Sequence, residues 1–189
     1  MHPDFKPHGV KVKPRSVNNI RGLALMYRRL LFKCEDNKSL NVVKSLEIIL
    51  GKLGVVLIIK TMEEMGNCEA AASPDTLELL IREDVYDALH NNDGRARFTI
   101  CHEIGHLTLH ENIALARANN GGHKIFEDSE WQANTFASEL LMPFNICKTI
   151  NSAIQVQIMY QTSYEASAYR LMKLESEKPT KALANVGSI

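Results

Sequence analysis

The chain contains 189 residues, of which 45% are hydrophobic and 23% are charged. This length supports one ordinary folded domain with small appendages, and the composition excludes a disordered or membrane-embedded chain. Lys and Arg total 22 and Asp and Glu total 22, so no net charge attracts the whole molecule to nucleic acid or to an anionic membrane.

The N-terminal segment and the cysteines indicate the compartment. Residues 1–15 are basic and broken by prolines, with no apolar run that could serve as a signal peptide. The longest apolar stretch, residues 53–59, is too short to span a bilayer. The four cysteines are scattered and form no C-x-x-C pair, which argues against a zinc ribbon or a dithiol redox site. We therefore predict a cytoplasmic protein with reduced, packed thiols.

The first half of the chain is predicted to contain an arm, two helices and a small sheet. Residues 1–15 form the flexible arm, because the prolines interrupt any helix. Over residues 16–34, apolar side chains recur at helical spacing, which predicts an amphipathic helix. A second helix is expected after Ser39, whose hydroxyl can cap it. Short apolar runs at residues 55–59 and 77–81 predict strands that pack against the helices.

The second half of the chain is predicted to be helical. Residues 95–110 have helical length and no proline, and a loop rich in Asn and Gly at 119–122 separates them from a helix over 126–142. Residues 145–175 predict two further helices with a turn near Thr162. The predicted fold class is therefore α+β, mainly helical, with a small β-sheet.

The segment His102-Glu103-Ile104-Gly105-His106 is an H-E-x-x-H motif. On a helix its two histidines lie one turn apart on the same face, so both imidazoles can reach one metal ion. Glu103 is offset from His102 by about 100° around the helix, which places it beside the metal and within reach of a proton from the attacking water. The motif therefore indicates metal-assisted hydrolysis.

A catalytic zinc site needs a third protein ligand besides the two histidines. His110 lies on the same face, but on a straight helix it is about 12 Å from His102 along the axis, too far for both to bind one ion at about 2 Å. The longer metzincin motif also fails, because Leu109 and Asn112 stand where its glycine and third histidine would fall. The third ligand is therefore expected from another element.

The next predicted helix offers that ligand. Glu130, Ala133, Asn134, Ala137 and Leu141 share one of its faces. The two alanines allow this helix to approach the motif helix closely, and Glu130 projects toward the metal. Asn134, one turn further on, is predicted to orient a ligating imidazole through its free ring N–H.

Several other polar side chains near the motif receive weaker interpretations. Glu127, Asp128 and Glu139 are interpreted as solvated or helix-capping charges, since acidic groups near a helix N-terminus are favourable. His123 is a candidate to stabilise an oxyanion or contact substrate, although a lone loop histidine is usually solvated. Cys101 is expected to pack in the interior.

Two segments resemble a known family. RFTICHEIGHLTLH and the pattern E-x-x-A-N-x-F-A-x-x-L-L-M-P, in this order and separation, closely resemble the ImmA/IrrE family of metallo-endopeptidases. The resemblance covers about residues 38–175 and is weak outside the two motifs. It implies that His102, His106 and Glu130 bind zinc and that Glu103 is catalytic. Manganese and iron are alternative metals, because selectivity follows availability as much as the ligand set.

The resemblance also implies a zincin-like fold and a biological role. Residues 16–143 would form the metallopeptidase domain, with the small sheet packed on the motif helix. Residues 144–175 would form a helical extension packed on the core, and residues 176–189 a flexible tail. Members of the family cleave helix-turn-helix transcriptional repressors, often of phage or stress-response origin. The expected partner is therefore a repressor, with no direct nucleic-acid or membrane binding.

Two alternative functions are weighed against the peptidase. In the first, the protein is a metal-bound regulatory module that binds a repressor or another protein without cleaving it. In the second, the C-terminal segment is a DNA-binding helix-turn-helix in which Ser163 opens a recognition helix that carries Arg170. The second lacks charge, because residues 145–174 contain only Lys148, Arg170 and Lys173 as basic groups. We therefore expect this segment to pack on the core or to dock the protein substrate.

Overall fold

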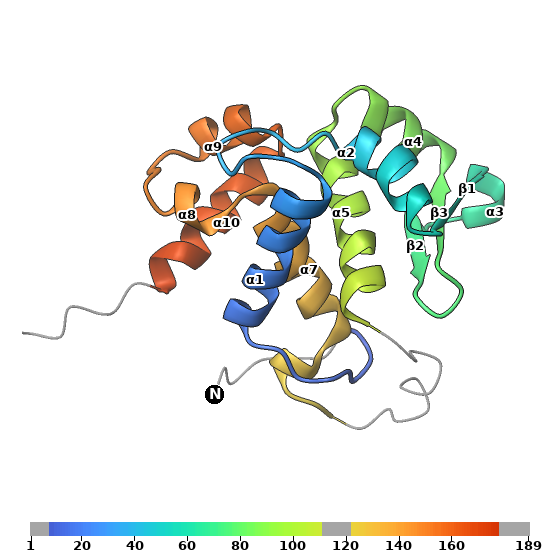
Figure 1. Cartoon of the computed structure of the whole chain (residues 1–189), viewed down its shortest axis with the longest axis horizontal. Coiled ribbons are helices and arrows are strands. Elements are labelled where there is room, and N and C mark those ends of the chain that lie inside the picture. The colour runs from blue at the N-terminus through green and yellow to red at the C-terminus, as the bar shows by residue number, and fades with distance from the viewer. Residues whose placement is uncertain (1–7, 111–121, 178–189) are drawn as a thin grey trace, which may run out of the picture.

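The computed structural model describes residues 8–110 and 122–177. A central helix, α5 (Gly94–Leu109), packs against a small sheet on one side, and the N-terminal and C-terminal helices lie on its other side (Figure 1). Helices α7 (Ser129–Leu141) and α1 (Val17–Met26) also lie in the middle of the molecule. Helix α7 packs extensively on both α5 and α1. The chain is therefore a mainly helical α+β protein, as the sequence predicts.

The first predicted helix is confirmed. The Ser16 hydroxyl accepts the Asn19 backbone N–H and caps α1, which continues into the π-helical turn η1 (Tyr27–Leu31). The second helix consists of α2 (Val42–Lys44) and the π-helical segment η2 (Ser45–Leu50). Its cap differs from the prediction, because the Asn41 side chain accepts the Lys44 N–H.

The hydroxyl of Ser39, expected to cap that second helix, has another role. It donates a hydrogen bond to the Tyr160 carbonyl oxygen at 3.1 Å and lies 2.9 Å from the Gln161 side-chain oxygen. The buried Arg97 guanidinium also donates to this hydroxyl, at 2.9 Å. Ser39 therefore joins distant parts of the chain, which local sequence patterns do not reveal.

The sheet has three strands in the order β1-β3-β2. Strand β1 (Val56–Lys60) pairs in parallel with β3 (Glu78–Arg82), and both were predicted within one residue. Strand β2 (Ala70–Ser73) pairs antiparallel with β3 and contacts α5, so it forms the edge nearest the motif helix. This third strand had no specific prediction, because a run of alanines has low β-propensity.

Two short helices flank the sheet. Helix α3 (Met62–Met65) begins with a capping box in which the Thr61 and Glu64 side chains each accept the other residue's backbone N–H. Helix α4 (Glu83–His90) follows β3 directly and buries Val85 and Leu89 against the core. Neither helix was predicted, and α4 contacts both the sheet and α5.

The predicted C-terminal segment of two helices contains three. They are α8 (Phe144–Cys147), α9 (Ala153–Tyr160) and α10 (Tyr164–Ser176). The Ser152 and Ser163 side chains accept backbone N–H groups at the starts of α9 and α10. Within the described residues, no helix is long and apolar enough to cross a membrane.

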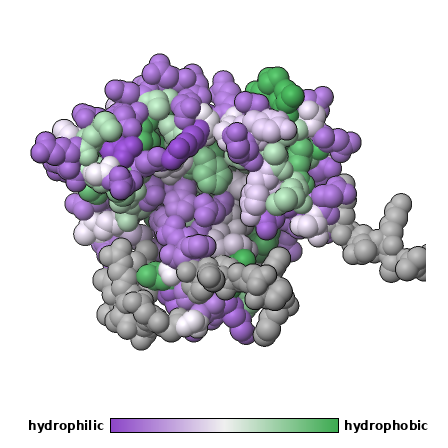
Figure 2. Space-filling model, turned by 180° about the vertical axis from the view of Figure 1, so that it is seen from behind, coloured by the Kyte–Doolittle hydropathy of each residue, from purple (hydrophilic) through white to green (hydrophobic). Residues whose placement is uncertain are grey.

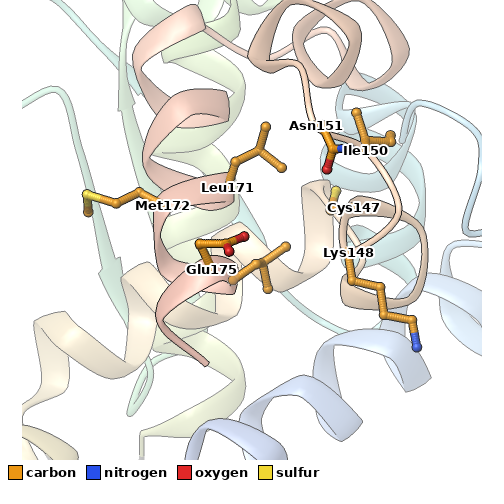
Figure 3. A pocket seen from close by; sticks show the side chains of 8 residues that line it. Cys147, Lys148, Ile150, Asn151, Leu171, Met172 and Glu175 are labelled. Atoms are coloured by element: carbon orange, nitrogen blue, oxygen red, sulfur yellow. The ribbon is translucent and has the colours of Figure 1, made fainter. Parts of the chain in front are cut away.

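A pocket of about 320 Å³ opens between α8 and α10 (Figure 3). Its lining residues are Cys147, Lys148, Ile150, Asn151, Leu171, Met172, Leu174 and Glu175. Figure 2 shows that hydrophobic side chains form separate groups on a largely hydrophilic face of the molecule. The exposed hydrophobic residues of α9 and α10 are Ile154, Ile158, Met159, Tyr164, Tyr169 and Met172.

Part of the predicted N-terminal arm contacts the domain. The Val12 N–H donates to the Glu127 carbonyl at 2.8 Å, and the Arg15 N–H donates to the Phe126 carbonyl at 3.0 Å. Residues 8–15 are therefore anchored beside the short 3₁₀ helix η3 (Ile125–Glu127). Residues 1–7, most of the predicted loop at 119–122 and all but the first two residues of the predicted tail lie outside the described residues.

Candidate metal centre

Helices α5 and α7 bring two histidines and one glutamate together. The Nε2 atoms of His102 and His106 lie 3.0 Å apart. One carboxylate oxygen of Glu130 lies 3.1 Å from His102 Nε2, and the other lies 3.3 Å from His106 Nε2. These donor atoms all fall within 4.8 Å of one another. The predicted third ligand therefore faces both imidazoles.

Two small residues let the helices approach this closely. A Cβ atom added at Gly105 would lie 3.1 Å from both the Cα and the carbonyl oxygen of Ala133. Ala133 and Ala137 are both fully buried at this contact. Glycine at position 105 and alanine at 133 thus set the spacing of α5 and α7, as the alanines of the predicted face suggested.

The donor set fits a divalent cation. Ligand atoms about 2.0–2.2 Å from a tetrahedral zinc ion lie about 3.3–3.5 Å from one another, close to the distances between these three side chains. Two imidazole nitrogens 3.0 Å apart cannot both direct bare lone pairs at each other, so either a hydrogen-bonded N–H or a metal ion lies between them. Imidazole and carboxylate together suit zinc or manganese.

The orientation of His102 is fixed from the far side of its ring. Its Nδ1 atom lies 2.9 Å from the Asn134 side-chain oxygen, so the ring N–H donates there and Nε2 keeps its lone pair for the centre. Burial lowers the pKa of His102, but hydrogen bonding to Glu130 and the charges of Glu103 and Glu130 outweigh it and raise that pKa. Asn134 thus lies where the sequence argument placed it.

The carboxylate of Glu130 is held in its ionised form. Hydrogen bonds from His102 and His106 place its pKa well below the usual range of a glutamate, in spite of partial burial. Its side chain remains 38% exposed. An ionised, partly open carboxylate is the form in which glutamate binds a metal.

Glu103 lies beside the candidate metal ligands, against the edge of the sheet. One of its oxygens accepts the Ala72 backbone N–H at 2.7 Å. Burial raises the pKa of Glu103, while His102 and His106 oppose that rise. This raised pKa suits a base that must take up a proton and release it. The β2 contact was missed, because the alanine strand gave no clear signal in the sequence.

His110 lies outside the cluster of three candidate ligands, but it contacts one of them. Its Nδ1 atom is 3.0 Å from His106 Nδ1, and its side chain is almost fully buried. Burial and the neighbouring His106 lower the pKa of His110 to about 3, so its imidazole is neutral. The spacing of four residues after His106 could have revealed this contact.

His123 and Asp128 form a separate pair at the start of α7. His123 Nε2 lies 2.9 Å from one Asp128 oxygen, and the other oxygen caps α7 by accepting the Trp131 N–H. The Gly9 N–H also donates to Asp128. Asp128 is thus a buried helix cap. The role of His123 toward an oxyanion stays a prediction, because this pairing places it on Asp128 and not among the ligands.

The interpretation of Glu139 as a solvated or capping charge is wrong. Glu139 is fully buried, and its two oxygens accept hydrogen bonds from Arg170 at 2.9 and 2.7 Å. Arg21 adds a third bond at 2.9 Å. Both arginines come from distant parts of the chain, so the local pattern could not show that this carboxylate is neutralised in the interior.

The other two local interpretations agree with the structure. Glu127 accepts the backbone N–H of Lys124 and caps η3. Cys101 is fully buried in the hydrophobic core, as its packing role predicted. Burial raises the pKa of its thiol to about 12, so it is not an acidic nucleophile beside the motif.

An H-E-x-x-H helix, a glutamate from the next helix and a strand edge beside the motif glutamate define a zincin-like metallopeptidase fold. The model of one peptidase family, M78, described as the IrrE N-terminal-like domain, matches residues 51–172, more than half of the chain. The chain belongs to this family, which confirms the resemblance found in the sequence. Among proteins with curated descriptions, none matches this chain.

Proposed function

We propose that the protein is a zinc-dependent endopeptidase that hydrolyses a peptide bond in a protein substrate. The observation that carries this proposal is the convergence of His102, His106 and Glu130 beside Glu103. Histidine, histidine and glutamate form a set that leaves the fourth zinc position open for chemistry. A purely structural zinc site would use all four positions for protein ligands.

Glu103 is proposed as the general base and acid. A bound metal would polarise the scissile carbonyl and make the attacking water more acidic. Glu103 would take the proton from that water and deliver it to the leaving amine. The Ala72 N–H donates to one oxygen of this carboxylate and so fixes the orientation of the Glu103 side chain.

The proposed substrate is a helix-turn-helix transcriptional repressor, so that cleavage would relieve repression. This part of the proposal rests on the family and not on a contact in the structure. It also implies action in the cytoplasm, where such repressors bind DNA. The competing function, a metal-bound module that binds the repressor without cutting it, predicts a different product.

The test is incubation of the metal-loaded protein with a candidate helix-turn-helix repressor, with and without chelator, followed by intact-mass analysis. Peptidase activity predicts two fragments whose masses sum to the intact repressor plus one water. An intact repressor in complex with the protein would favour the binding module instead.

The matched variants are Glu103→Gln and Glu63→Gln, because Glu63 is exposed on α3 away from the metal ligands. Glu103→Gln keeps the shape and the Ala72 contact but cannot act as a base. It should lower the cleavage rate by about 10²- to 10⁴-fold while the metal is retained. Glu63→Gln should cleave at the wild-type rate. Full activity in a metal-loaded Glu103→Gln preparation would remove the role assigned to Glu103.

A further inference from the structure

His106 has two ring nitrogens that face different partners. Nε2 faces His102 and Glu130, and Nδ1 faces His110 Nδ1 at 3.0 Å. A histidine that binds a metal through Nε2 carries its proton on Nδ1 and needs an acceptor there. For His102 that acceptor is Asn134. For His106 the atom in place is His110 Nδ1.

This pairing determines where His110 carries its own proton. If Nδ1 accepts the hydrogen bond from His106, the proton of the neutral His110 ring must sit on Nε2. Nε2 of His110 and the side-chain oxygen of Gln132 are both buried, and neither has a hydrogen-bond partner among the described residues. The two side chains nevertheless interact. A small adjustment would pair this donor with this acceptor.

The amide of Gln132 is oriented for that contact. Its Nε2 donates to the Lys13 and Phe126 carbonyl oxygens, each at 2.8 Å. Carbonyls only accept hydrogen bonds, so the amide cannot be flipped, and its oxygen points away from these two partners. Gln132 is fully buried on α7, one turn before Phe136.

We propose that His110 is a positioning residue that holds His106 in its metal-binding orientation, with Gln132 holding the tautomer of His110. The inference rests on the metal site of the proposed function. Asn134 and His110 then serve the two ligating histidines in the same way, each as the acceptor for one ring N–H. Removal of the acceptor leaves His106 Nδ1–H buried without a partner, which disfavours the orientation needed to bind the ion.

A packing role for His110 makes the opposite prediction from a hydrogen-bonding role, and two substitutions separate them. His110→Phe fills the site with an aromatic ring slightly larger than imidazole but removes the acceptor. His110→Asn leaves unfilled space but places an oxygen close to the position of Nδ1. Packing alone predicts that His110→Phe behaves better than His110→Asn, and the proposed role predicts the reverse order.

The experiment measures the Zn²⁺ affinity of the metal-free full chain by competition with a chromophoric chelator. His110→Phe should bind Zn²⁺ about 10- to 100-fold more weakly than wild type, the usual cost of losing an orienting partner. His110→Asn should fall between them. The control is His90→Phe, because His90 is an exposed histidine at the end of α4 whose Nδ1 contacts the carbonyl oxygen of Tyr86, away from the candidate ligands. This control should bind as wild type does.

The absorption spectrum of the Co²⁺-loaded proteins provides a second measurement of ligand geometry. It should change in His110→Phe and be restored in His110→Asn. Equal affinity and identical spectra in His110→Phe and wild type would overturn the inference, as would weaker binding by His110→Asn than by His110→Phe. If the wild type binds Zn²⁺ but cuts no substrate, the peptidase proposal fails while the affinity series still supports the inference. If the wild type binds no Zn²⁺, both fail.

Discussion

Two glutamates of the same helix, Glu130 and Glu139 on α7, differ in their exposure and in the side chains that they face. Glu130 is 38% exposed and faces two imidazoles. Glu139 is fully buried and faces the guanidinium groups of Arg21 and Arg170. An imidazole can give up its proton and offer a lone pair to a metal, whereas a guanidinium keeps its charge and offers only donors. Whether such a site can hold a cation therefore depends on the side chains that face the glutamate, imidazole or guanidinium, and not on the glutamate itself.

The comparison also clarifies the role of the C-terminal helices. Arg170 of α10 and Arg21 of α1 both bind Glu139, so this carboxylate links three helices. Arg170 is buried and also donates to the Met142 carbonyl. A side chain held in this way cannot reach the phosphates of DNA. The arginine that a recognition helix would have used is a structural residue.

The largest effect on stability is expected from Glu139→Ala. It leaves Arg170 buried without its charge partner, and breaking a buried pair in this way costs about 3–5 kcal/mol. Urea unfolding of the metal-free protein measures the loss. Glu165→Ala, at an exposed position in the first turn of α10, is the control and should change little. A loss below about 1 kcal/mol would place this pair with surface ion pairs, whose contribution is that small.

Glu130→Gln is expected to have the opposite pattern to Glu139→Ala, with a large effect on Zn²⁺ binding and a small effect on stability. Removal of a ligand should weaken Zn²⁺ binding by more than the 10- to 100-fold typical of an orienting partner, roughly a hundredfold or beyond. Its effect on unfolding should be smaller than that of Glu139→Ala, because water already reaches the Glu130 side chain. Isothermal titration calorimetry and urea unfolding on the same preparations measure both. Equal destabilisation by the two substitutions would remove the distinction between the two glutamates.

Asn134→Ala is expected to have a more moderate effect on the same site. The substitution removes the acceptor for His102 Nδ1–H but leaves all three ligands in place. Zn²⁺ affinity should fall by about 10- to 100-fold. Because Asn134 is exposed, the free energy of unfolding of the metal-free protein should hardly change. Unchanged Zn²⁺ affinity, measured by chelator competition, would mean that His102 needs no orienting partner.

The smallest expected effect is on the reactivity of two thiols, those of Cys101 and Cys147. Both are buried, as Glu139 is. Burial raises the pKa of Cys101 to about 12 and that of Cys147 to about 11. A raised pKa favours the thiol, so the reactive thiolates form only as the pH rises well above the ordinary value of 9.0. At pH near 8, a disulfide reagent should modify exposed Cys68 first, and Cys101 and Cys147 only on unfolding. Equal rates for all of them in the native protein would contradict the burial of these two thiols.

Local periodicity was sufficient to predict the centre of the site and the main helices. The spacing of His102 and His106 fixes both on one helical face, and the shared face of Glu130 and Asn134 pointed to the same candidate centre. Features that depend on distant partners were missed. Glu139 was interpreted as a surface or capping charge because its arginines lie far away in the sequence. The contact of His110 was overlooked because the helical geometry was used only to exclude it as a ligand.

Strand β2 and helix α4 show a second kind of limit. The alanines of β2 have weak preference for a strand, and they become one because β3 supplies the pairing and α5 supplies the packing surface. Helix α4 is short and begins directly at the end of β3, without a side-chain cap. Its buried Val85 and Leu89 are explained only by the core that they complete.

The most direct test of the metal centre is native mass spectrometry of the full chain after reconstitution with zinc, for wild type, Glu130→Gln and Glu139→Gln. We expect one zinc ion per chain in the wild type and in the folded fraction of Glu139→Gln, and loss of the ion in Glu130→Gln. A wild-type chain that carries no zinc, or a Glu130→Gln chain that retains the ion as firmly as wild type does, would contradict the assignment of this site.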